Sequence, residues 1–230
     1  MTHPDIVIDQ IPVNFKNAAF LNAGPKQLGD SHRAELLEHV RIAKAIARPK
    51  ALYLSASILL PRAQTVEVLG HSIENPILYA NLQRLNRVFV FIITCGVELA
   101  EWKNSLSSAV DRFFADLVSE HALGAAYNHL AAHITAAYHA HGLASMNPGS
   151  TPGWQIEDQR IIFSILKNAK EKIGVELRDS FFMVPTHSAS GILFESEKGY
   201  QNCQLCALEN CPNRSAPFNP AGYEHLFHAM

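Results

Sequence analysis

Hydrophobic and polar positions alternate along some parts of the chain, and apolar residues form short unbroken runs in others. Arg87–Thr94 (RVFVFIIT) is β-branched and aromatic throughout, which is typical of a strand buried on both faces. Alternation and turn signals predict further strands at residues 5–13, 52–60, 65–69, 181–184 and 190–194. Pro61 is expected to separate the second of these from the third.

Apolar residues recur every three to four positions in the remaining ordered parts of the chain. This spacing predicts helices over residues 32–46, 76–85 and 158–173. The longest such pattern runs from Leu99 to Tyr138 and predicts either one helix of about 40 residues or two helices that meet near Gly124. Strands and helices interleave irregularly, which favours an α+β fold over a parallel βαβ array.

Composition narrows the class of protein. The 230 residues are 48% hydrophobic and 17% charged, enough for one large domain, expected at residues 1–199, with a tail at 200–230. A net charge of −2 without a basic stripe argues against nucleic acid as the main partner. The run Val88–Ile93 is too short to span a bilayer, and the N-terminus has no secretory pattern. We therefore expect a cytoplasmic protein without a membrane partner; the oligomeric state, including a homo-oligomer, stays open.

Three cysteines crowd into one short segment, CQLCALENC, as Cys203, Cys206 and Cys211. Thiolates at this C-x2-C-x4-C spacing suit zinc or an iron–sulfur cluster, and in a reducing compartment a metal site is favoured over disulfides. The alternative is three reduced surface thiols. Cys95, a histidine such as His187, or a group from a second subunit would supply a further ligand.

Cys95 has two interpretations of its own. It follows the buried strand and precedes Gly96 and a helix, and a helix N-terminus lowers the pKa of a thiol. The other interpretation is a small buried apolar side chain, which is common for cysteine. His129 and His133 share a helix face but lack an H-E-x-x-H pattern, so we expect ordinary helix-surface histidines there.

Two loops are candidates for ligand binding. Residues 145–154 (SMNPGSTPGW) form a long loop rich in glycine and proline that leads into a helix, and such loops either bind ligands or only connect elements. In the second loop, Ser188 and Ser190 lie between apolar strands and offer hydroxyl groups to a ligand. His187 stands beside them, but no G-x-S-x-G motif is present, which argues against a serine hydrolase.

These loops carry a family resemblance. From the P-G loop onward, the order Leu177, Asp179-Ser180, Met183, Pro185, Ser188, Ser190-Gly191 and Phe194 resembles the activation domain of vitamin B12-dependent methionine synthase. Thr94-Cys95-Gly96 and the cysteine tail resemble stand-alone bacterial members of this family. The resemblance implies a bent antiparallel sheet with flanking helices, S-adenosylmethionine binding, and methylation and reduction of cob(II)alamin on a corrinoid-bearing protein or methyltransferase.

The resemblance also implies which residues bind the ligand: Pro148, Gly149, Ser150, Trp154, Ser188, Ser190 and Tyr200. The family has an arginine three residues before the P-G pair and a tyrosine after it, where this chain has Ser145 and Ser150. The arginine would pair with the ligand carboxylate, and serine supplies no such charge. The fold is therefore expected to transfer better than S-adenosylmethionine binding, and the ligand is expected to be changed or lost.

Three functions follow from these observations, and whether the protein is an enzyme stays open. The first is an accessory protein for corrinoid reactivation, with an iron–sulfur cluster in the tail as the source of a low-potential electron. The second is a non-catalytic metal-binding scaffold or carrier that holds zinc and no longer binds S-adenosylmethionine. The third is an enzyme that uses S-adenosylmethionine on another substrate, which the missing arginine disfavours.

Overall fold

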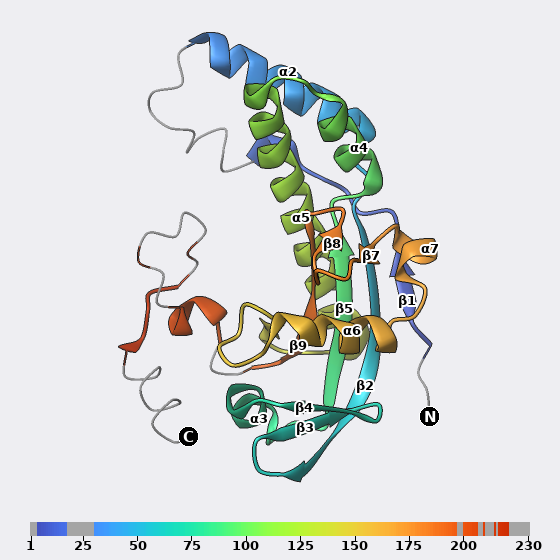
Figure 1. Ribbon diagram of the computed structural model, residues 1–230, viewed down its shortest axis with the longest axis vertical. Helices are drawn as coiled ribbons and strands as arrows, with labels where there is room; N and C mark the ends of the chain where they lie inside the picture. Colours follow the sequence, from blue (N-terminus) through green and yellow to red (C-terminus); the bar gives the residue numbers. More distant parts are fainter. Residues whose placement is uncertain are drawn as a thin grey trace.

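The computed structural model describes residues 4–17, 30–196, 200–206, 209, 214 and 216–220 (Figure 1). They form an α+β fold in which an antiparallel sheet is flanked by helices, as the sequence predicts. Seven strands of this part of the chain make one sheet in the order β4-β3-β2-β5-β9-β6, with β1 paired to β2. The short strands β7 and β8 form a separate antiparallel pair.

The strands are β1 (Ile6–Ile8), β2 (Lys50–Arg62), β3 (Thr65–Val68), β4 (His71–Glu74), β5 (Arg87–Thr94), β6 (Leu143–Met146), β7 (Glu176–Leu177), β8 (Met183–Val184) and β9 (Ser188–Glu195). The helices are α2 (Asp30–Ile46), α3 (Pro76–Leu82), α4 (Val97–Ser105), α5 (Ala109–Tyr138), α6 (Gln159–Ile165) and α7 (Ala169–Ile173). Short 3-10 turns are η1 (Phe15–Asn17), η2 (Ile156–Asp158) and η3 (Asn202–Leu205).

Strand β5 is buried on both faces, as its sequence predicts. Phe89 and Phe91 pack on one face in a cluster with Leu130 of α5, whereas Val90 and Ile92 pack on the other face in a cluster with Ile162 of α6. The sheet therefore separates two apolar layers, one under α5 and one under α6. A third cluster packs α2, α4 and α5 together beyond the end of β5.

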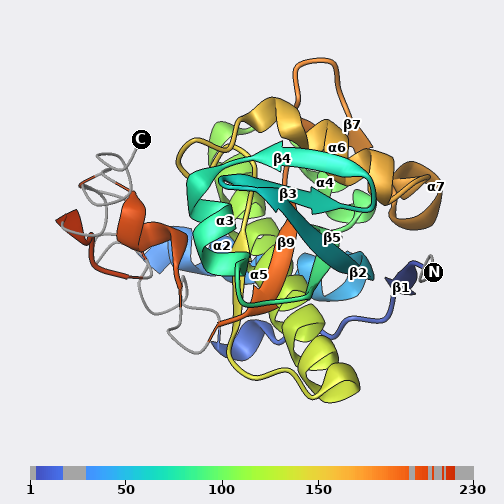
Figure 2. The ribbon, with the colours of Figure 1, turned by 90° about the horizontal axis from the view of Figure 1, so that it is seen from below.

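The views in Figures 1 and 2 show how these parts are arranged. The helices α2 and α4 and the first half of α5 lie at one end of the molecule, and β3, β4 and α3 lie at the other. The described tail residues extend to one side of the sheet. Among the described helices, none combines the length and the apolar composition that crossing a membrane requires.

Several predicted boundaries were wrong. Pro61 does not end a strand, because β2 continues to Arg62. The pairing of β2 with β3 is irregular between Leu59 and Arg62. A proline, which has no N–H to donate, is tolerated at such an irregularity. The long helical pattern does contain two helices, but they meet at residues 106–108 and not at Gly124. Ser108 caps α5 by accepting a hydrogen bond from the backbone N–H of Asp111, so the second helix begins there.

The remaining differences concern short elements. Residues 158–173 are split between α6 and α7, because Asn168 adopts a left-handed conformation with a φ of 61°. Strand β1 is shorter than predicted, and β4, β6 and β7 stand in segments for which no strand was predicted. Strand β6 matters most for function, because it brings the P-G loop to the edge of β9.

Candidate ligand cleft and cysteine tail

A cleft of about 460 Å³ lies at the exposed edge of strand β9. Strand β6 pairs only with Ile192–Glu195, so the first half of β9 has no strand on that side among the described residues. The P-G loop that follows β6 borders this edge. The cleft brings together five of the seven residues that the resemblance assigned to ligand binding: Pro148, Gly149, Ser150, Ser188 and Ser190.

The P-G loop is a hydrogen-bonded turn. The carbonyl oxygen of Asn147 accepts from the backbone N–H groups of Ser150 (3.1 Å) and Thr151 (3.0 Å), and Gly149 N–H donates to the carbonyl of Trp154 (2.8 Å). Gly149 has a φ of +80°, and a Cβ atom there would lie 3.2 Å from the Ile156 side chain. Glycine at this position therefore serves both the turn and the close approach of η2.

Asn147 joins three parts of the site. Its side-chain Nδ2 donates to the carbonyl of Ser190 at 2.7 Å, and its Oδ1 accepts from Asn202 Nδ2 at 3.3 Å. Thr151 Oγ1 accepts from the Asn147 backbone N–H at 3.1 Å and lies 3.3 Å from Asn202 Oδ1. This network links the P-G loop to β9 and to the beginning of the tail. The sequence analysis did not assign Asn147 a role.

The two serine hydroxyls of β9 are oriented by partners on either side. Ser188 Oγ donates to Thr94 Oγ1 at 3.0 Å, at the end of β5. Ser190 Oγ lies 3.5 Å from Gln159 Oε1, and both of these residues are buried. Gln159 also lines the cleft, and sequence reasoning missed it. Gln159 is a polar residue at the start of α6, and the sequence alone does not show that this position is buried.

The other two predicted ligand residues lie outside this cleft. Trp154 is 2% exposed and packs in the core cluster that contains Ile162 of α6, so it anchors the end of the P-G loop in the core. Tyr200 lines a second depression, together with Cys203, Ser145 and Tyr127. Because Ser145 and Tyr127 also line the first cleft, the two hollows adjoin. Burial raises the pKa of the Tyr200 phenol, so it is neutral at physiological pH.

The cysteine tail forms a tight turn at Cys203 and Cys206. The backbone N–H of Cys206 is 3.4 Å from the carbonyl of Cys203. The guanidinium of Arg214 donates to the carbonyls of Cys203 (3.0 Å) and Cys206 (3.1 Å), and this contact had no sequence signal. Cys211 lies outside the described residues. Within the described part, no three histidine, cysteine or acidic side chains gather as a metal site, so the tail metal stays a prediction.

Cys95 is a small buried side chain, which was the second of its two interpretations. The side chain is 1% exposed and packs with Val118 and Leu99 in the helical cluster. Burial raises the pKa of the thiol to about 12, so the expected lowering by the following helix is outweighed. The thiol is therefore protonated, and a protonated thiol is a poor metal ligand.

The histidines His187 and His133, which the sequence singled out, have hydrogen-bond or ion-pair partners within the protein. His187 Nε2 lies 3.5 Å from Asp116 Oδ1, and the same carboxylate pairs with Lys103. Burial lowers the pKa of His187, and the Asp116 carboxylate partly offsets this effect. His133 Nε2 is 2.9 Å from the hydroxyl of Tyr53, which ties α5 to β2. His133 therefore has a packing role in the described structure.

Comparison with known proteins identifies the fold. No protein-family profile and no curated protein sequence matches the chain. Among solved structures, the MetH reactivation domain bound to AdoHcy superposes with a TM-score of 0.62 and 11% sequence identity, covering 86% of this chain and 80% of that chain. At this identity the likeness establishes the fold alone. This chain is therefore similar in fold to a reactivation domain over 86% of its length.

Proposed function

We propose that this protein is an accessory protein that docks on a corrinoid-bearing protein and helps to return its cobalt to a usable state. The observation that carries the proposal is the fold shared with the MetH reactivation domain over 86% of the chain. The P-G loop and the Ser188–Ser190 segment also meet at one cleft.

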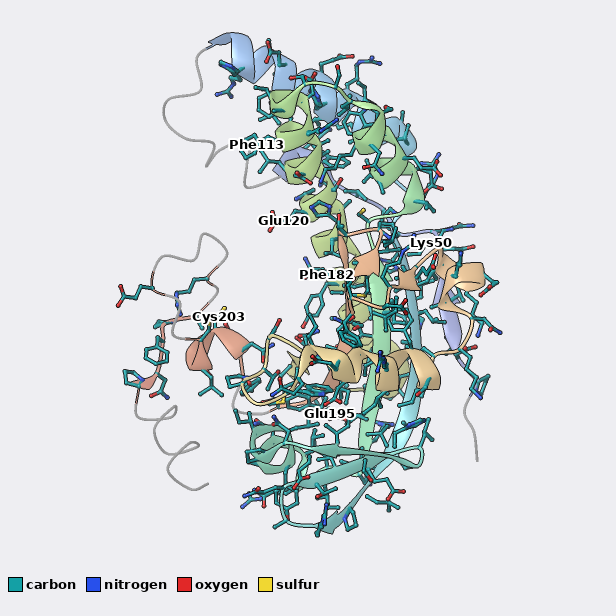
Figure 3. The ribbon with its side chains drawn as sticks, viewed as in Figure 1. Lys50, Phe113, Glu120, Phe182, Glu195 and Cys203 are labelled. Atoms are coloured by element: carbon teal, nitrogen blue, oxygen red, sulfur yellow. The ribbon has the colours of Figure 1, made fainter. Side chains whose placement is uncertain are left out.

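Exposed aromatic side chains support a docking role. Phe182 is 65% exposed and Phe113 is 50% exposed, although aromatic side chains are usually buried. In Figure 3 both project on the side of the molecule where the tail carries Cys203. Val184, also exposed, follows Phe182 closely in the chain. We propose that Phe182 and Val184, which are exposed close together in the chain, contact the corrinoid-bearing partner, because neighbouring exposed apolar groups mark interaction surfaces.

The cysteine tail is the proposed metal site, with Cys203, Cys206 and Cys211 as ligands. The described residues of the tail fit a turn that presents two thiols to a metal. Arg214 holds this turn by donating to the backbone carbonyls of Cys203 and Cys206. An iron–sulfur cluster bound there would supply the low-potential electron that converts Co(II) to Co(I). The depression that contains Cys203 adjoins the ligand cleft, so both would act beside the same partner surface.

Sedimentation tests the docking role. The full chain, purified without oxygen, is mixed with a cobalamin-loaded fragment of a methionine synthase that lacks its own reactivation domain. We expect the cobalamin absorbance to sediment faster with the chain present, and a Phe182→Ser variant to weaken this shift. An unchanged sedimentation rate at every concentration of the chain would overturn the proposal.

The second candidate is a zinc-binding scaffold, and Ser145 in the place of the family's arginine favours it. Iron, zinc and acid-labile sulfide measured on the same anaerobic sample separate the two. Iron with sulfide and a visible absorbance band support the redox role. Stoichiometric zinc without colour supports the scaffold, because zinc has no redox chemistry in proteins.

A further inference from the structure

We infer that Cys203 and Cys206 form a redox-active dithiol, which closes to a reversible disulfide by exchange with a low-molecular-weight disulfide such as oxidised glutathione. The inference goes beyond the proposed function, because it concerns these two thiols in a chain that carries no metal. In a reducing compartment, such a disulfide is usually transient and serves catalysis or redox sensing. Its formation would also regulate the proposed metal site, because the oxidised pair leaves Cys211 as the one remaining thiol of the tail.

The two cysteines stand three positions apart in one tight turn. The 3-10 turn η3 spans Asn202–Leu205, and the backbone N–H of Cys206 lies 3.4 Å from the carbonyl oxygen of Cys203. Residues at the two ends of such a turn have Cα atoms less than about 7 Å apart, and their side chains lie on the same side. Disulfides usually join cysteines whose Cα atoms are about 4.4–6.8 Å apart. The turn therefore suits a disulfide without a large movement of the backbone.

Contacts with three other parts of the protein hold this turn in place. The guanidinium of Arg214 donates to both cysteine carbonyls, at 3.0 and 3.1 Å. Leu205, which stands between the cysteines, is buried in the core cluster under α6. The backbone N–H of Asn219 donates to the carbonyl of Gln204 at 2.8 Å. Because the turn is held, each thiol is presented to the other at a high effective concentration.

The pair is also accessible, unlike the remaining described cysteine. Cys203 and Cys206 are both partly exposed, and each borders a hollow at the surface. Cys95 is 1% exposed, and burial raises the pKa of its thiol to about 12. Since the oxidation of cysteine follows exposure and thiolate character, we expect exchange at the pair and not at Cys95.

The exchange balances with the small disulfide as the sole oxidant. One protein thiol attacks the small disulfide, which forms a mixed disulfide and releases one small thiol. The second protein thiol then attacks the mixed disulfide, which forms the Cys203–Cys206 bond and releases a second small thiol. Two protein thiols are thus oxidised, one small disulfide is reduced, and both hydrogens leave on the small thiols. An excess of the small thiol reverses both steps.

Equilibration with glutathione redox buffers tests the inference on the full-length Cys211→Ser variant. This variant lacks the third tail thiol and a proposed metal ligand, so only the pair and Cys95 remain as thiols. We expect one intramolecular disulfide, which peptide mass spectrometry places between Cys203 and Cys206. Reduced glutathione in excess should open it again. A chain that stays reduced in excess oxidised glutathione, stops at a mixed disulfide, or forms a disulfide through Cys95 would overturn the inference.

An Arg214→Gln change in the same background tests how the turn is held. Arg48→Gln is the matched control, because Arg48 also donates to two backbone carbonyls, those of Ala45 and Ala47 at 3.1 and 2.8 Å. We expect Arg214→Gln to shift the equilibrium towards the dithiol by about tenfold, which corresponds to one lost hydrogen bond from a charged group. Equal equilibria in the two variants would contradict the role of Arg214. Thermal unfolding checks that each variant is folded.

The result is independent of the proposed function. Docking is judged by sedimentation, and the metal is judged by analysis of the anaerobic sample. A missing disulfide would therefore leave both of those proposals standing. A Cys203–Cys206 disulfide in a chain that binds neither metal nor a corrinoid-bearing partner would support the inference alone.

Discussion

The side-chain amide of Asn147 donates to the backbone carbonyl of Ser190 across 2.7 Å, and this contact fixes the P-G loop against the exposed edge of the sheet. The two residues are far apart in sequence and belong to the two segments that carry the family resemblance. The contact occupies a position on β9 that a neighbouring strand would otherwise fill. It therefore holds the P-G loop beside the cleft that both residues line.

An Asn147→Ala variant should lower the stability of the folded protein. The change removes the side-chain bonds to Ser190 and Asn202, and a single lost bond to a buried partner costs about 1–3 kcal/mol. We therefore expect the free energy of unfolding, measured by chemical denaturation, to fall by at least this amount. Asn81→Ala is the matched control, because Asn81 Nδ2 also donates to a backbone carbonyl, that of Ile77 at 2.9 Å, in α3. Equal losses of stability in the two variants would show that Asn147 does not hold the P-G loop against β9.

Gly191→Ala should disrupt the same contact from the other side. A Cβ atom at Gly191 would clash with the carbonyl oxygen of Met146 and lie 2.6 Å from Asn147 Nδ2. We expect a lower unfolding temperature. Gly124→Ala, in the middle of α5, meets nothing within 4 Å and should stabilise the helix by about 0.5–1 kcal/mol. Thermal unfolding compares the two, and a neutral Gly191→Ala would contradict the geometry.

Serine replacements should separate the tail cysteines from Cys95. We expect Cys203→Ser, Cys206→Ser and Cys211→Ser each to remove most of the bound metal. Cys95→Ala should keep its metal, because the thiol is buried in the helical core and protonated. The measurement is metal content per chain after anaerobic purification. Loss of metal in a folded Cys95→Ala protein would make Cys95 a ligand.

Stability should fall in mild acid through His187. Burial lowers the pKa of His187 in the folded protein below its usual value near 6.5, so the unfolded chain binds more protons in this range. The contribution is complete above the unfolded pKa of about 6.5 and is lost as the pH falls towards the lower folded pKa. Chemical denaturation between pH 7.5 and about 5 should show a smaller loss in His187→Gln than in wild type. The exposed His141→Gln is the control, and it should follow the wild-type curve.

Much of the fold was predictable from local patterns. The β-branched run of β5 and the end of α2 at Ile46 match the structure, because burial on both faces and a following proline leave clear local signals. Strand β6 was missed because it depends on pairing with β9, which lies far along the chain. The break before α5 depends on a single Ser108 cap, which is weak evidence against a long apolar periodicity.

The candidate site was predicted in part for the same reason. The P-G loop and Ser188–Ser190 carry turn and motif signals, and the structure places them together. Asn147, Gln159 and Arg214 act through contacts between distant segments, so no spacing within the sequence singles them out. Trp154 carried an aromatic signal; it is buried in the core and also lines a further hollow with Gly149 and Cys206, so its assignment to ligand binding stays a prediction.

The most direct test of the central claim is whether this chain changes the oxidation state of a corrinoid. A cob(II)alamin-loaded methionine synthase fragment without its own reactivation domain is mixed with the chain and a chemical reductant, and the electron paramagnetic resonance signal of Co(II) is followed. We expect the signal to disappear faster with the wild-type chain than with the reductant alone, and the Cys203→Ser variant to lose this acceleration. An identical decay with and without the chain would contradict the account.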